Sequence, residues 1–172
     1  MLKHKILIMG LPGSGKTTLA NIVAKNLQAV HFNADEVRHE INSHLSFSVE
    51  DRIEQARRMG WLCDKVVEAG HFVVADFVCP IEETRKAFGC DHAFVVWVDR
   101  IREGRFENTN KLFVPPERFD LRVYGTNKAE YWAERVCGAV LSVPSGLNAA
   151  PRRPLFSNAP DLGEKSLPTR DI

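Results

Sequence analysis

Residues 5–18, KILIMGLPGSGKTT, decide the fold of this chain. An apolar run at residues 5–9 leads directly into a glycine-rich turn, and the turn leads into residues 16–27, whose apolar side chains recur at helical spacing. The turn fits the pattern GxxxxGK followed by Ser or Thr, in the strand-before and helix-after context that this pattern requires. It predicts a phosphate-binding loop made by nine residues: Gly10, Leu11, Pro12, Gly13, Ser14, Gly15, Lys16, Thr17 and Thr18.

The chemistry of this loop points to a nucleoside triphosphate. Glycines let successive backbone N–H groups turn inward, and the helix N-terminus adds partial positive charge. We expect Lys16 to neutralise the β- and γ-phosphates and Thr17 to ligate Mg²⁺. The ligand is ATP or GTP, and the guanine-recognition sequence NKxD is absent, since residues 126–129 read TNKA. The plain alternative is a glycine-rich turn without a ligand.

Short apolar runs alternate with helical patterns along residues 1–142. The runs lie at residues 5–9, 30–32, 72–75 and 93–98. A second long helical pattern covers residues 49–69, with Ser48 and Asp51 at capping-box spacing, and Asn127 and Glu130 similarly open a final helix that runs to about Leu141. This alternation predicts an α/β P-loop fold of the nucleotide-kinase type, with a parallel sheet and helices on both faces. Residues 143–172, rich in proline and without apolar periodicity, are expected to form a disordered tail.

The composition is that of one soluble domain, with 172 residues, 26% of them charged, and a formal net charge of +1. A net charge so close to zero argues against a protein that binds nucleic acid mainly through a large excess of positive charge. No apolar run reaches the length of a membrane span, and the N-terminus lacks a signal-peptide pattern, so we expect a cytoplasmic protein without a membrane partner. The four cysteines are far apart and predict free thiols.

Two aspartates follow predicted strands, at the edge where the carboxyl ends of parallel strands meet. Asp35 follows residues 30–32 and is expected to orient or deprotonate an acceptor hydroxyl, with Arg38 able to bind an acceptor phosphate. Asp76 ends the third run and is expected to hold Mg²⁺, partly through water. The alternatives are that Asp35 only caps a helix and that Asp76 is a solvated strand end.

Residues 100–118 are charged, polar and broken by prolines, which predicts a mobile lid. Arg105 is our candidate for stabilising charge on a transferred phosphoryl group, and Phe113 is a candidate for stacking on a base. For any single arginine, a solvated surface position is the alternative. The basic residues of this segment are Arg100, Arg102, Arg105, Lys111 and Arg118.

Three further segments resemble adenylylsulfate kinase. NADEVR at residues 33–38 is similar to the family motif DGDNVR, FSVEDRIEQARR at residues 47–58 to FSxEDRxENxRR, and DFVCP at residues 76–80 to SFISP. The resemblance covers about the first 100 residues. It implies phosphoryl transfer from ATP to a hydroxyl, with Asp35 as general base or Mg²⁺ partner. It also implies that Phe47 stacks on the acceptor, while Arg38 and Arg52 contact the acceptor's phosphate.

The chain also departs from that family. Asn33 stands at the first Asp of DGDNVR, and Asp76 and Cys79 stand at the serines of SFISP. The family's lid sequence KGLYKKA is absent, and ENTNKLFVPPERFDLRVY at residues 107–124 takes its place. This lid looks like that of bacteriophage kinases that phosphorylate 5-hydroxymethyluracil in DNA during thymine hypermodification. The arrangement of Asp35 with Arg38, and of Asp76 with Arg85, is also similar to phage polynucleotide kinases.

Three functions therefore remain open on the sequence. The first is a kinase of 5-hydroxymethyluracil in phage DNA, which would act in the host cytoplasm on a flipped-out nucleotide. The second is an adenylylsulfate 3′-kinase, which would use the same ATP, Mg²⁺ and catalytic residues, Asp35, Lys16 and Arg105. The third is an ATP-binding regulatory module without turnover.

Overall fold

A parallel β-sheet forms the centre of the computed structural model, which describes residues 4–142; the tail expected over residues 143–172 lies outside the described residues. The strands stand in the order β2-β3-β1-β4-β5, and every neighbouring pair is parallel. Because β1 is central, the loop that follows it lies in the middle of the carboxyl edge of the sheet. The strands are β1 (Lys5–Gly10), β2 (Val30–Asn33), β3 (Val73–Phe77), β4 (Phe94–Val98) and β5 (Leu121–Val123).

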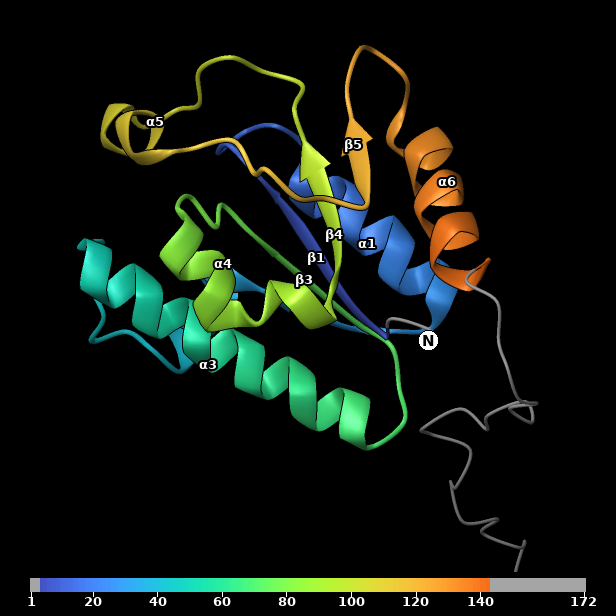
Figure 1. Ribbon diagram of the computed structural model, residues 1–172, viewed down its shortest axis with the longest axis horizontal. Helices are drawn as coiled ribbons and strands as arrows, with labels where there is room; N and C mark the ends of the chain where they lie inside the picture. Colours follow the sequence, from blue (N-terminus) through green and yellow to red (C-terminus); the bar gives the residue numbers. More distant parts are fainter. Residues whose placement is uncertain (1–3, 143–172) are drawn as a thin grey trace, which may run out of the picture.

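Helices cover both faces of the sheet (Figure 1). α1 and α6 pack on one face, whereas α2, α3 and α4 pack on the other. The predicted α/β P-loop architecture is therefore confirmed. The helices are α1 (Lys16–Leu27), α2 (Ala34–Glu40), α3 (Val49–Glu68), α4 (Glu82–Phe88), α5 (Glu107–Leu112) and α6 (Ala129–Leu141), with a short 3-10 turn at Cys90–His92.

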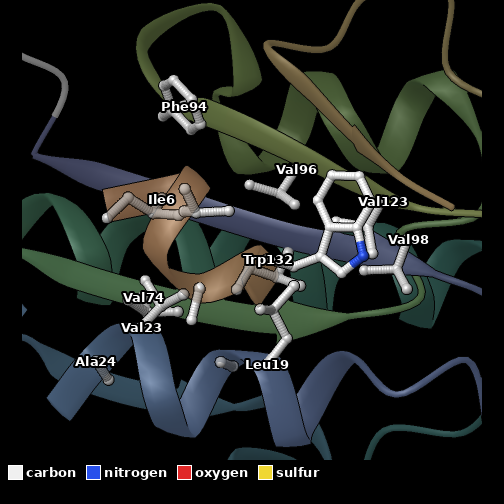
Figure 2. Close-up of a cluster of buried hydrophobic side chains, with 14 of the residues drawn as sticks. Ile6, Leu19, Val23, Ala24, Val74, Phe94, Val96, Val98, Val123 and Trp132 are labelled. Carbon is white, nitrogen blue, oxygen red and sulfur yellow. The ribbon is translucent and has the colours of Figure 1, made fainter. Parts of the chain in front are cut away.

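The core under α1 and α6 shows why the central strands are mostly apolar (Figure 2). Leu19 and Val23 of α1 pack with Ile6 and Val96 of the sheet, and Trp132 of α6 closes the same cluster. Alternate residues of β1 reach the opposite core beneath α3 and α4. A strand buried on both faces reads as a continuous apolar run, as residues 5–9 do.

Most predicted elements are present, and the differences have local causes. Ser48 caps α3 as expected, because its hydroxyl accepts a hydrogen bond from the Asp51 N–H at 3.2 Å. The final helix begins at Ala129 with Lys128 as its N-cap, slightly later than the Asn127 start expected. The sequence patterns do not predict β5, α4 or α5, because three strand residues and helices of seven and six residues are too short for a periodic pattern.

All four cysteines are free thiols in the structure, as predicted. Cys63 lies buried in the core under α3, and burial raises its pKa to about 12. In the part of the chain that the structure describes, no helix combines the length and apolar character needed to cross a membrane.

Candidate active site

The loop after β1 is shaped by close contact with the neighbouring strand. Gly10 has a φ of 148°, and a Cβ atom there would lie 2.4 Å from the Val98 carbonyl oxygen of β4, so that only glycine fits. Gly15 caps α1 with a φ of 97°. These two positions turn the chain from the sheet edge into the helix, so the first backbone N–H groups of α1 face the loop.

Two polar side chains of this loop are buried, and one of them has no hydrogen-bond partner among the described residues. The Ser14 hydroxyl is inaccessible to solvent and has no hydrogen-bond partner among the described residues. Lys16 is buried, and its ammonium donates to the Leu11 carbonyl at 2.9 Å. Burial lowers the pKa of Lys16, while the carboxylates of Asp76 and Asp35 act in the opposite direction. A donor hydroxyl, a buried cation and the N–H groups at the start of a helix fit the oxygen atoms of a polyphosphate.

Asp76 brings the ends of β2, β3 and the phosphate loop together. Thr17 Oγ1 donates to Asp76 Oδ2 at 2.6 Å. The Asn33 side-chain amide donates to both oxygens of the same carboxylate, at 3.1 and 3.2 Å. His31 Nε2 lies 2.7 Å from Oδ1. Hydroxyl and carboxylate oxygens side by side suit a hard cation such as Mg²⁺, so Thr17 and Asp76 are the residues that fit it.

Asn33, not Asp35, is the N-cap of α2. Its side-chain oxygen accepts hydrogen bonds from the N–H groups of Asp35 at 3.0 Å and Glu36 at 3.1 Å. The alternative that Asp35 serves as the helix cap is therefore wrong. The Asp35 carboxylate stays exposed and faces the same cavity as Lys16.

Two arginines flank Phe47, in the segment that resembles an acceptor motif. The Arg38 guanidinium lies 4.7 Å from the centre of the Phe47 ring and donates to the carbonyls of Leu45 and Ser46 at 3.1 and 2.7 Å. The Arg52 guanidinium lies 5.4 Å from the same ring and donates to the Phe47 carbonyl at 2.9 Å. Burial lowers the pKa of both guanidinium groups. The ring itself is 66% exposed, which leaves a face open to a ligand.

One cavity of about 900 Å³ joins these groups. The expected site residues that line it are Pro12, Gly13, Gly15, Lys16, Thr17, Thr18, Asp35, Arg38, Phe47, Arg52, Asp76 and Arg105. Phe113 does not line it, because its side chain packs against the core under α3 and α4. Phe106, which is 62% exposed, lines the cavity instead. The sequence could not distinguish these two lid aromatics.

The lid lies directly on the phosphate loop. A Cβ atom at Gly104 would meet Pro12 Cδ at 2.9 Å, and the Arg105 side chain packs over Gly13. The Asn110 side chain closes the turn, because it accepts from the Gly104 N–H at 2.8 Å and donates to the Gly104 carbonyl at 3.0 Å. These contacts explain how Arg105 comes to line the cavity.

A second contact connects the lid to the acceptor side. Arg52 donates to the Thr109 hydroxyl of α5 at 3.2 Å, and Thr109 is buried. A smaller cavity, of about 360 Å³, lies where β4 and β5 end and is lined by Arg100 and Tyr124 among others. Arg100 spans to the loop before α6 by donating to the carbonyls of Gly125 at 3.1 Å and Asn127 at 2.6 Å.

Comparison with known proteins identifies the first part of this site. The family model described as adenylylsulphate kinase matches residues 3–99, which contain the phosphate loop, Asp35, the Phe47 segment and Asp76. The chain belongs to the adenylylsulphate kinase family. The match with the family ends at Asp99, one residue before the lid begins.

Curated relatives match about half of the chain. An adenylyl-sulfate kinase of Bacillus licheniformis is 42% identical over 91 residues, 48% of this chain and 46% of the relative. A probable adenylyl-sulfate kinase of Bacillus subtilis is 40% identical over 92 residues, 49% of this chain and 47% of the relative. The chain thus spans about half the length of these relatives.

Structural similarity covers more of the chain than sequence similarity does. The structure of the Mycobacterium tuberculosis APS kinase CysC in complex with AMPPNP and APS superposes with a TM-score of 0.72 at 24% identity, over 80% of this chain and 98% of that one. These relatives support the resemblance to adenylylsulfate kinase. They give no support to the expected resemblance of the lid to phage hydroxymethyluracil kinases.

Proposed function

We propose that this protein is a kinase that transfers the γ-phosphoryl group of ATP to the 3′-hydroxyl of adenylylsulfate. The observation that carries the proposal is the single cavity in which a phosphate loop, an exposed carboxylate and an aromatic ring flanked by two arginines meet. The family model over residues 3–99, which contain the phosphate loop, Asp35, Phe47 and Asp76, supports the choice of acceptor together with the relatives named adenylyl-sulfate kinase.

The nucleotide end of the cavity suits ATP. The Lys16 ammonium and the N–H groups at the start of α1 would bind phosphate oxygens, and Thr17 with Asp76 would hold Mg²⁺. Mg²⁺, when bound, supplies positive charge that offsets the charge of the phosphates. We assign the adenine of ATP to the smaller cavity beside Arg100 and Tyr124. This cavity adjoins the phosphate loop, because an Arg100 nitrogen lies 3.9 Å from the Cβ position of Gly15.

The acceptor end suits a small anionic nucleotide. The acceptor base would stack on the open face of Phe47, and Arg38 and Arg52 would bind the acceptor's charged group. Asp35 takes the proton of the hydroxyl as its oxygen bonds to the γ-phosphorus, and the bond from that phosphorus to the bridging oxygen breaks to release ADP. Arg105, held over Gly13, offsets the charge of the transferred group.

A second candidate acceptor is 5-hydroxymethyluracil in DNA. The observation in its favour is that the family match ends where the lid begins, so the part of the site that encloses the acceptor is not covered by it. The lid is rich in arginine, and Phe106 is exposed at the cavity. The chemistry at Asp35 would be the same for both acceptors.

Incubation with γ-labelled ATP and either acceptor decides between these functions. We expect label to move to adenylylsulfate, at a rate at least ten times that of transfer to DNA containing 5-hydroxymethyluracil. Label found only in the DNA would select the second candidate. Binding of ATP without transfer to either acceptor would instead favour the regulatory module without turnover.

Gly104→Ala tests the contact between the lid and the phosphate loop. The residue has an ordinary backbone conformation, so the added methyl acts only through its clash with Pro12 and Asn110. We expect kcat/KM for ATP to fall about tenfold, since displacement of Arg105 by about 1 Å misplaces its charge. Glu103→Ala, at the exposed neighbouring position, is the control and should leave this value within twofold. An unchanged kcat/KM in Gly104→Ala would show that the lid does not act through this contact.

A further inference from the structure

Asp76 is one of the most enclosed charged groups in the site. Its exposed fraction is 2%, and it receives hydrogen bonds from three side chains. A carboxylate in such surroundings is stable only if its oxygens have partners. The partners also fix its direction, because each oxygen has its own donor: Thr17 on Oδ2 and His31 on Oδ1, with Asn33 between them.

His31 reaches Asp76 from a side that the other partners do not occupy. In the β2–β3 register, Asn33 lies opposite Asp76 and His31 lies opposite Val74. His31 therefore lies two residues before Asn33 on β2. Because side chains of a strand alternate between its faces, His31 and Asn33 are on the same face of the sheet. Thr17 approaches from the phosphate loop at the other end. His31 thus contacts the Asp76 carboxylate on the side away from the phosphate loop.

Asn33 cannot do this alone, because its side chain has a second task. Its oxygen caps α2 through the N–H groups of Asp35 and Glu36, so only its amide donors are left for Asp76. Those donors bridge both carboxylate oxygens at 3.1 and 3.2 Å, which does not distinguish one oxygen from the other. The shorter 2.7 Å contact to His31 does distinguish them.

The pairing of β2 with β3 places these side chains together. Asn33 is the last residue of β2, and Asp76 lies near the end of β3. The two positions face each other across β2 and β3. The one carboxylate of this pair is on β3, where His31 of β2 is within hydrogen-bond distance of it.

We infer that His31 is a positioning residue for the cation site: it fixes Asp76 Oδ1 so that Oδ2 stays directed at Thr17. This rests on the proposed function, since the cation is the Mg²⁺ that accompanies ATP. Residues that orient a metal-site carboxylate from behind typically change metal affinity 10- to 100-fold when removed.

The test is Mn²⁺ binding, measured by electron paramagnetic resonance in the presence of AMPPNP, which needs no turnover. For His31→Leu and His31→Asn, the second of which is too short to reach Asp76, we expect the Kd for Mn²⁺ to rise about tenfold. His31→Gln keeps a donor of sufficient length and should stay within about threefold of the unmodified protein. The control is His71→Leu, a half-buried histidine beyond the opposite end of β3.

Turnover gives an independent readout. The apparent KM for Mg²⁺ should rise in His31→Leu, whereas kcat at saturating Mg²⁺ should change by less than about threefold. Should His31→Leu fail to fold, His31→Asn carries the same comparison. If Mn²⁺ affinity is normal in both His31→Leu and His31→Asn but weak in Asp76→Asn, the inference about His31 is overturned while the proposed function stands. Normal Mn²⁺ affinity in Asp76→Asn as well would remove the cation site from the proposed function.

Discussion

Replacing Asp35 with asparagine is expected to lower kcat about 10²- to 10⁴-fold while the Kd for ATP stays within about threefold. The substitution removes the proton acceptor but preserves shape, and general-base catalysis contributes rate factors of this size. The helix should not be affected, because Asn33 caps α2 through the Asp35 backbone N–H and not through its carboxylate. Steady-state kinetics with adenylylsulfate and a binding titration with AMPPNP measure the two quantities.

Glu36→Gln is the matched control for this experiment. Glu36 is an exposed carboxylate in the same first turn of α2, and its N–H binds the same Asn33 oxygen. It does not line the large cavity. We expect kcat to change less than twofold. If kcat of Asp35→Asn is as high as that of Glu36→Gln, Asp35 is not the base. If the protein shows no turnover and Asp35→Asn leaves its ATP-dependent function unchanged, the regulatory module is favoured.

Replacing Gly60 with alanine is expected to lower the free energy of unfolding by about 2 kcal/mol. Gly60 lies on α3 where this helix meets the end of α4, and a Cβ atom there would stand 2.6 Å from the Phe88 carbonyl oxygen. That carbonyl accepts a hydrogen bond from the buried Lys5 ammonium at 2.6 Å, which also donates to Asp64 at 2.8 Å. Separating the helices therefore strains a polar contact that solvent does not reach.

Gly138→Ala is expected to stabilise the protein, whereas the same type of substitution at Gly60 destabilises it. Gly138 is exposed on α6, and its Cβ position has nothing within 4 Å. Alanine there should raise the free energy of unfolding by about 0.5–1 kcal/mol, because it favours the helix over the unfolded chain. Urea unfolding of both variants measures the difference. Equal effects of the two substitutions would show that the α3–α4 contact at Gly60 is looser than the structure indicates.

The parts of the fold that could be predicted depend on local pattern. The phosphate loop, the long helices and the apolar strands each have a spacing that a single segment displays, and so do Asp35 and Asp76 at strand ends. His31 does not: its role depends on β2 lying beside β3 in register, which no local pattern reveals. The two contacts of Asn33, which caps α2 and binds Asp76, likewise depend on strand pairing and on the backbone of α2, which its place in a motif does not reveal.

The lid shows a different limit. Its charge and its prolines predict an irregular segment over the site, and the structure does place Arg105 in the cavity. Which aromatic ring turns inward depends on how the segment returns to the sheet. Arg85 donates to the carbonyls of Pro80 and Val114, and the Val114 N–H donates to Pro80. This return path draws Phe113 against the core and leaves Phe106 at the cavity.

The strand order also constrains how the chain is assembled during synthesis. β1 pairs only with β3 and β4, and β2 pairs only with β3, so no two strands within the first 72 residues are neighbours. While the ribosome makes that stretch, α1 and α3 can form but the sheet cannot begin. The phosphate loop precedes both neighbours of β1 in the chain, and the Val98 carbonyl that lies against Gly10 belongs to β4. We therefore expect a fragment that ends before β4 to bind ATP poorly, because its phosphate loop lacks the strand against which Gly10 packs.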